Sequence, residues 1–240
     1  MSMFRALMMS RGGEAAPLLH IPLDTDWRCL LNGEPLTDDD VTVTGDAGIG
    51  EAGGVACAVT GDWSSKYFEL TSDRAKEALG TVSGSAPRTV SIWYCRLSGN
   101  NSWDWHGLVG WGSKNSNRFY SIEFKPDYDN LLTNLWSYSG DIIEESFETI
   151  EVPENEWHHA VSVFVPETTE VLTYLDGALV GRAVPRTFDT ANSAKIAVGT
   201  RFEDDSHYFA GGLRDARIYA QAMSAAEVAA LYNQQKSLYQ

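Results

Sequence analysis

The chain has 240 residues, of which 43% are hydrophobic, and this length suits one large domain with a sizeable core. Its 33 acidic side chains outnumber its 18 lysines and arginines, which gives a formal net charge of -15 at pH 7. Because such a surface repels a phosphate backbone, we expect no nucleic-acid partner.

Residues 1–16 are predicted to form an N-terminal arm, separate from a single domain over residues 17–240. The apolar run at residues 6–9 is too short for a signal peptide, and no run in the chain reaches the length of a membrane span, so we expect no membrane insertion. The arm is either a frayed terminus or an assembly arm that buries its apolar side chains against other protein subunits. In the second case the contact residues are Met3, Phe4, Leu7, Met8 and Met9.

Short strands joined by turn-forming residues are predicted for most of the remaining chain. The sequence predicts an edge strand in residues 17–26, a loop or irregular strand in residues 32–54, and two strands in residues 53–73. Residues 89–97 alternate cleanly, which places Trp93 and Cys95 on one face of a strand. Further strands are expected at residues 118–125, 131–138, 155–165, 171–184 and 195–200.

In the last part of the sequence, the spacing of apolar residues changes from strand-like to helical. Residues 211–219 have a strand-like pattern, and Ser224 then stands as an N-cap with Glu227 three residues on. Val228 and Leu231 follow at helical spacing, so a short C-terminal helix is predicted behind the last strand. With no helix expected between the strands, the pattern indicates an antiparallel two-sheet sandwich.

Several of these motifs, in this order, resemble those of the LamG-like, or concanavalin A-like lectin-glucanase, family. The strongest is F-x-G-x-L-x-D-x-R-I-Y-x-x-x-M-S-x-x-E-V-x-x-L-Y at residues 209–232, joined by W-H-H-A-V at 157–161 and Y-L-D-G at 174–177. The resemblance runs from about residue 17 to 235. It implies an all-β fold, an antiparallel two-sheet jelly-roll sandwich with a short C-terminal helix. The same resemblance makes Trp93 a core residue and either His158 or His159 a structural histidine.

Three cysteines are too few and too widely spaced for a disulfide framework. Cys57 and Cys95 lie in apolar strands, where a thiol behaves as a small core side chain. We expect Cys29 to be a core thiol as well; the alternative is a disulfide or metal role.

The densest group of binding-type side chains lies in residues 98–107. Exposed tryptophan is costly without a partner, and aromatic faces beside polar groups suit the C–H faces and hydroxyls of sugars. The candidate carbohydrate-binding residues are Asn100, Asn101, Trp103, Asp104, Trp105, His106 and Tyr138. The alternative is that one tryptophan folds inward and closes the end of the sandwich.

The resemblance also implies a calcium ion, because LamG-like domains often hold one. Calcium prefers six or more oxygen ligands, and the candidate ligands are Asp24, Asp26, Asp204, Asp205 and Asp215. Arg214 stands where the family usually has the first of two aspartates. The alternative is an ion pair of Arg214 or Arg217 with a neighbouring aspartate.

We expect no catalytic activity and assign no catalytic residue. Retaining glycoside hydrolysis needs two carboxyl groups about 5 Å apart on one strand face. The nearest patterns fail, because Pro126 interrupts Glu123 and Asp127, and residues 141–145 alternate wrongly. No G-x-S-x-G motif is present, so a serine hydrolase is not predicted either.

A lectin-like fold without a signal peptide needs another route to an exterior. Single-module LamG-like domains also occur in bacteriophage structural proteins, which are made in the host cytosol. We therefore expect a non-catalytic interaction module displayed on a larger oligomeric assembly such as a virion, as a decoration or tail-associated protein contacting cell-surface glycans. The alternatives are a purely structural virion decoration protein, and a stand-alone carbohydrate-binding lectin domain in the cytosol or outside the cell.

Overall fold

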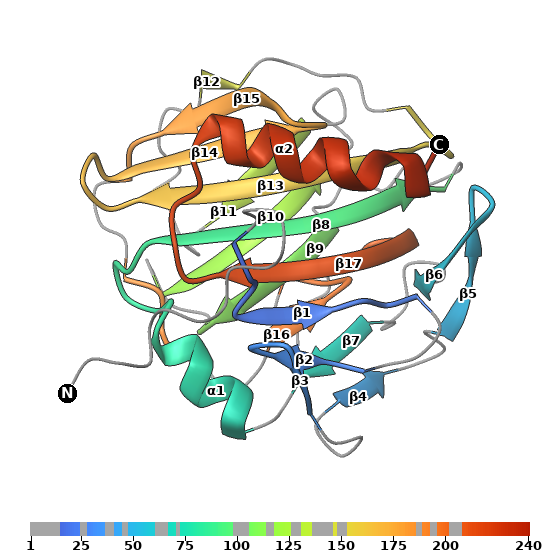
Figure 1. Ribbon diagram of the computed structural model, residues 1–240, viewed down its shortest axis with the longest axis horizontal. Helices are drawn as coiled ribbons and strands as arrows, with labels where there is room; N and C mark the ends of the chain where they lie inside the picture. Colours follow the sequence, from blue (N-terminus) through green and yellow to red (C-terminus); the bar gives the residue numbers. More distant parts are fainter. Residues whose placement is uncertain are drawn as a thin grey trace.

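Two antiparallel sheets packed face to face form the body of the protein (Figure 1). The computed structural model describes residues 15–24, 28–36, 41–44, 48–60, 67–70, 73–97, 106–113, 118–125, 131–135, 146–147, 153–185, 189–192, 196–201 and 208–240. Within these residues no helix is long and apolar enough to cross a membrane.

The larger sheet has the order β12-β15-β14-β13-β8-β17-β1-β2-β3, and β6 pairs with both β17 and β5. Its strands are β1 Leu19–Ile21, β2 Leu30–Leu31, β3 Glu34–Pro35, β5 Gly48–Ala52, β6 Val55–Thr60, β8 Arg88–Arg96, β12 Ser146–Phe147, β13 Trp157–Val165, β14 Glu170–Leu175, β15 Ala178–Ala183 and β17 Gly211–Tyr219. The smaller sheet has the order β11-β10-β9-β16-β7-β4. Its strands are β4 Val41–Thr44, β7 Tyr67–Leu70, β9 His106–Gly112, β10 Phe119–Lys125, β11 Leu131–Leu135 and β16 Ile196–Val198.

The central strands of the larger sheet are covered on both faces. Ile92 and Tyr94 of β8 face the core between the sheets, together with Trp111 of the smaller sheet. Helix α2 (Ala225–Gln235), followed by the short 3-10 helix η2 (Lys236–Leu238), lies across the other face (Figure 1), where its Val228 packs with Val161 of β13. All nine residues of β8 are therefore buried.

The C-terminal helix begins as its sequence predicts. The Ser224 hydroxyl accepts a hydrogen bond from the Glu227 backbone N–H, and the Glu227 carboxylate accepts one from the Ser224 backbone N–H at 2.7 Å. This capping box pairs two backbone donors that a helix start would leave without partners.

Three local expectations were wrong. Helix α1 (Asp73–Gly80) lies between β7 and β8, where no helix was expected, and it buries Ala75 and Leu79. Residues 32–54 contain β4 and β5 as regular strands, because β4 pairs with β7 and β5 forms a hairpin with β6. β1 is not at the edge of its sheet, since it lies between β17 and β2.

The three cysteines are buried free thiols, as expected for core residues. Burial raises the pKa of Cys57 and of Cys95 to about 11. Both sulfurs are therefore protonated near neutral pH and act as packing groups.

Candidate functional site

Several strands end or begin at one end of the sandwich, next to the tryptophan-rich segment. β8 ends at Arg96 and β9 begins at His106, so residues 98–105 join the larger sheet to the smaller one here. β13 and β17 begin at the same end, because Trp157 pairs with Cys95 and Gly211 pairs with Arg96. We call this the loop end; in Figure 1 it lies at the right, on the side of the C-terminus.

His106 is the predicted sugar-binding residue that the structure describes. Its side chain is buried, and its Nδ1 donates a hydrogen bond to the Tyr208 carbonyl oxygen at 2.6 Å. His106 thus holds the chain before β17 against the start of β9, and its part in binding stays a prediction. The other candidates lie outside the described residues: Asn100, Asn101, Trp103, Asp104, Trp105 and Tyr138.

An ion pair fixes the end of β8 to the chain before β13. Arg96 Nη1 lies 3.2 Å from Glu154 Oε1, and the Asn155 backbone N–H donates to the Arg96 carbonyl at 2.7 Å. Arg96 is almost fully buried, whereas the Glu154 side chain is a third exposed. The base of the 98–105 segment is therefore held by both backbone and side-chain contacts.

A second acidic group fixes the turn between β14 and β15. Asp176 Oδ2 accepts a hydrogen bond from His158 Nδ1, and its Oδ1 accepts one from the His159 backbone N–H, both at 2.8 Å. Asp176 has φ 51°, a left-handed conformation that a short polar side chain tolerates better than most. The carboxylate thus ties this turn to the start of β13.

Two buried polar groups lie next to this turn. Tyr94 packs against His158 with ring centroids 6.0 Å apart. The Tyr94 hydroxyl and His158 Nε2 are buried, and neither has a hydrogen-bond partner among the residues that the structure describes. Burial raises the pKa of Tyr94, so its hydroxyl keeps its proton.

A buried ion pair lies on the smaller sheet close to the loop end. Arg201 donates from Nε and Nη2 to the two carboxylate oxygens of Glu123, at 2.5 and 2.8 Å. Glu123 stands opposite Gly107 of β9. A Cβ on Gly107 or Gly110 would come within 2.1 or 1.9 Å of the Arg201 backbone, so two glycines let that backbone lie directly on β9.

The sequence did not identify this ion pair. In the sequence, Glu123 is a candidate only for a catalytic carboxylate, and no pattern points to Arg201. The signal that could have found it is the pair of strand glycines, because glycine inside a strand often marks the close approach of another backbone.

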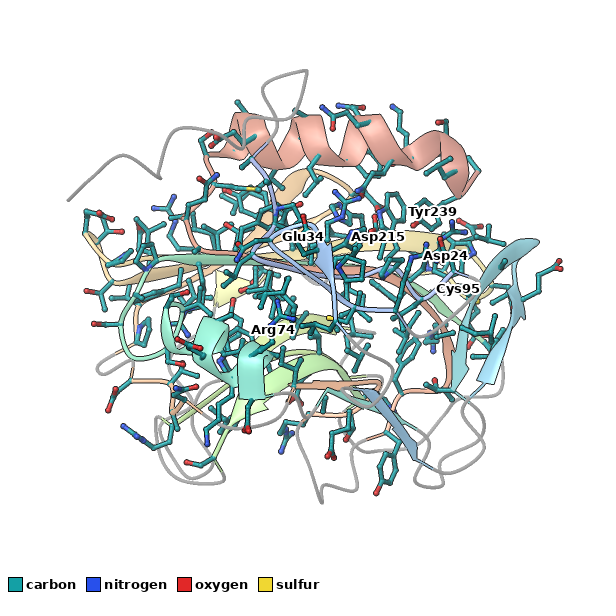
Figure 2. All side chains as sticks on the ribbon, turned by 60° about the horizontal axis from the view of Figure 1, so that its bottom comes forward. Asp24, Glu34, Arg74, Cys95, Asp215 and Tyr239 are labelled. Atoms are coloured by element: carbon teal, nitrogen blue, oxygen red, sulfur yellow. The ribbon has the colours of Figure 1, made fainter. Side chains whose placement is uncertain are left out.

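The two described calcium candidates accept hydrogen bonds from basic side chains. Asp24 accepts hydrogen bonds from Arg28 at 2.9 and 3.0 Å, and Asp215 accepts from His20 at 2.5 Å and Arg217 at 2.9 Å. Asp24 and Asp215 lie on the same side of the molecule as Tyr239 (Figure 2). Burial raises the pKa of Tyr239, and the charges of Asp215 and Asp24 raise it further.

These contacts match the alternative of an arginine–aspartate ion pair in β17. Burial raises the pKa of Asp215, but the hydrogen bond from His20 and the charge of Arg217 outweigh it and hold the pKa below its usual range. Across the described ranges, no group of three or more His, Cys, Asp or Glu side chains is placed to hold a metal ion. Asp26, Asp204 and Asp205 lie outside those ranges, and a calcium site stays a prediction.

Two antiparallel sheets, a capped helix over the outer face and a polar loop end define a lectin-type jelly-roll sandwich. The sequence profile of the concanavalin A-like lectin/glucanases superfamily matches residues 64–229. The chain belongs to this superfamily. No curated protein matches the sequence.

Solved structures share the fold at low sequence identity. Domain 4 of AbnA, a GH43 extracellular arabinanase from Geobacillus stearothermophilus solved in complex with arabinotriose, has 17% identity and a TM-score of 0.56, covering 91% of this chain and 99% of that domain. The binding domain of botulinum neurotoxin DC in complex with SialylT has 14% identity and a TM-score of 0.57, covering 91% of this chain. A structure reporting that cell entry of botulinum neurotoxin type C depends on two ganglioside molecules has 14% identity and a TM-score of 0.59, covering 94%. This chain spans about half the length of the neurotoxin chains, 51% and 52%.

Proposed function

We propose that this protein is a carbohydrate-binding module whose site lies at the loop end. The observation that carries the proposal is the segment 98–105, in which Trp103 and Trp105 flank Asp104 at the point where β8 passes to β9. The ion pair of Arg96 and the hydrogen bonds of Asp176 fix the flanking strand ends, which supports a preorganised site. The arabinotriose and SialylT complexes of the structural neighbours give further support for a glycan ligand.

Binding without hydrolysis is part of the proposal. Glu123 is a strand carboxylate close to the loop end, but Arg201 binds both of its oxygens and the pair is buried. A carboxylate held in this way is poorly placed to act as a nucleophile or a general acid on a sugar.

Removing the indole rings should abolish most of the binding. We expect Trp103→Ala and Trp105→Ala each to weaken glycan binding at least about tenfold, because each removes a stacking surface at the centre of the site. Trp103→Phe and Trp105→Phe are the matched controls and should retain part of the affinity. A glycan array followed by calorimetry measures the effect, with thermal unfolding to verify the fold; unchanged binding in both alanine variants would contradict the proposed site.

We further propose that the domain is displayed on a larger assembly, such as a virion, through residues 1–16. Met3, Phe4, Leu7, Met8 and Met9 lie outside the described residues, so this part rests on their sequence. Ala15, where the described chain begins, packs against the apolar cluster under α2. The junction with the arm is therefore beside the helix and not in the core between the sheets.

Deleting the arm should change the oligomeric state. We expect the full chain to sediment as an oligomer and a chain that starts at Ala16 to sediment as a monomer, because the apolar arm side chains supply the contact. Sedimentation velocity at several concentrations makes the comparison. Identical monomers would remove the assembly role, while oligomers without any glycan binding would favour a purely structural decoration protein.

A further inference from the structure

Two large apolar side chains of β15 are exposed on the face of the larger sheet that carries α2. Leu179 is 46% exposed and Val184 is 53% exposed. Leu179 pairs with Tyr174, which packs in the apolar cluster under α2, so the Leu179 side chain lies on this outer face. Arg182 pairs with Leu172 on the same face, and Val184 follows two residues later. The helix therefore leaves this part of the face uncovered.

The exposed apolar surface continues onto β14 and β13. Leu172 of β14 and Val165 of β13 are partly exposed and pack against the same cluster. Glu170 lies opposite Val165 and forms an ion pair with Arg182 at 3.0 Å. An exposed apolar patch bordered by polar side chains is typical of a surface that binds another chain. We call this surface the outer patch: Val165, Leu172, Leu179 and Val184, with the ion pair of Glu170 and Arg182.

The N-terminal segment joins the domain beside the outer patch. Ala15, the first residue that the structure describes, packs against the same cluster as Val165 and Leu172. Residues 1–14 precede it and span at most about 50 Å when fully extended. The large apolar residues of this segment are Met1, Met3, Phe4, Leu7, Met8 and Met9. A segment of suitable length and chemistry to cover the patch therefore begins next to it.

The charge of this segment is opposite to that of the rest of the chain. Its charged residues are Arg5, Arg11 and Glu14, which give a formal charge of +1. The total of -15 thus leaves -16 for the remaining residues. Electrostatic attraction therefore favours contact of the segment with the body of this protein.

We propose that the outer patch binds the N-terminal segment of a second copy of this chain. The inference rests on the proposed assembly role of residues 1–16 and names the partner. Ala15 and the patch lie on one face, so two copies that face each other about a two-fold axis place each segment on the other's patch. Such an arrangement is closed, and each dimer contains the contact twice.

Polar substitutions in the outer patch test the proposal. We expect Leu179→Ser combined with Val184→Ser to weaken self-association at least about tenfold, because each exposed apolar group is lost from two contacts per dimer. Ile49→Ser combined with Leu238→Ser is the matched control, since these side chains are 36% and 61% exposed on β5 and η2. The control should associate as the unmodified protein does. Sedimentation velocity over a range of concentrations measures the effect, with thermal unfolding to verify each fold.

The outcomes separate the patch from the assembly role. Equal association of the patch variant and the unmodified protein would overturn the inference. If the chain that starts at Ala16 were then a monomer, the assembly role would stand and the segment would bind another surface. A full-length chain that is a monomer at every concentration would contradict the assembly role and the inference together.

Disulfide cross-linking identifies the copy to which the segment binds. The three native cysteines are buried, so the thiols introduced by Met8→Cys and Val184→Cys are the ones expected to react. The two single variants are mixed as dilute solutions, concentrated, and oxidised in air with a copper catalyst. We expect a dimer that joins position 8 to position 184, and far less product when Leu238→Cys replaces Val184→Cys. A chain that carries both substitutions and closes only within itself would show that the segment binds its own patch, which would overturn the proposal.

Discussion

Replacing Glu123 by alanine is expected to lower the free energy of unfolding by about 3–5 kcal/mol. Glu123 is fully buried and Arg201 nearly so, and two hydrogen bonds join them. Removing the carboxylate leaves the guanidinium in a site with little water, where a charge is costly to keep without its counterion. Urea unfolding measures the change, with a constant slope as the check on two-state behaviour.

Two further variants separate the charge effect from the loss of packing. Glu123→Leu combined with Arg201→Met removes both charges and should recover most of the loss, because apolar side chains of similar volume often replace a buried ion pair at little cost. Glu170→Ala, in the exposed pair with Arg182, should cost no more than about 1 kcal/mol. If Glu123→Ala cost no more than Glu170→Ala, the buried pair would not stabilise the smaller sheet.

The elements that the sequence predicts well carry their signal locally. β8 and β13 are nine residues long and rich in β-branched and aromatic side chains, and α2 has its capping box within four residues. The short elements have no comparable pattern. β4 forms because it pairs with β7 in the smaller sheet, a contact that no short window of sequence can show. β5 forms a local hairpin with β6, but its sequence GIGEA has little β-propensity of its own.

The polar groups of the site also divide into those that the sequence shows and those that only the fold reveals. The binding-type composition of residues 98–105 is visible in the sequence, whereas the partners that hold its base are not. Other polar pairs of the fold are equally hidden in the sequence: Glu123 and Arg201 are separated by 78 positions, and His20 and Asp215 by 195. Their pairing follows from the arrangement of several strands in the folded chain. A search along one strand for catalytic or metal-binding carboxylates considers only residues that are near in sequence, and therefore misses the basic side chains that Glu123 and Asp215 contact.

Acidification from about pH 6.5 to pH 4 should destabilise the fold through His159 by about 3 kcal/mol. The ring of His159 is fully buried and stacks on Trp93 with centroids 4.9 Å apart, and neither ring nitrogen has a hydrogen-bond partner among the described residues. Burial lowers the pKa of His159 from 6.5 to about 4. Asp215 and Asp176 oppose this shift and Arg217 adds to it, but burial is the largest cause.

The sign of this pH dependence follows from whether the folded or the unfolded state binds the proton first as the pH falls. Between pH 6.5 and 4 the unfolded chain protonates its histidine while the folded chain keeps it neutral, so stability is full above this window and falls as the pH decreases through it. Below about pH 4 the folded protein also binds the proton and the loss from this residue stops growing. The contribution of Asp215, whose pKa is held below 3.8, is lost mainly below about pH 4 and overlaps only with the acidic end of that window.

His159→Phe isolates this contribution, because phenylalanine keeps a flat ring against Trp93 and has no group to protonate. Near pH 8 the variant should be at least as stable as the unmodified protein, since it removes two buried nitrogens without partners. Urea unfolding at a series of pH values should then show a difference between the two proteins that grows in favour of the variant from pH 6.5 to 4. A constant difference across that window would mean that His159 exchanges its proton with solvent as an ordinary histidine does, and hence that the layer between the larger sheet and the C-terminal segment is open to water.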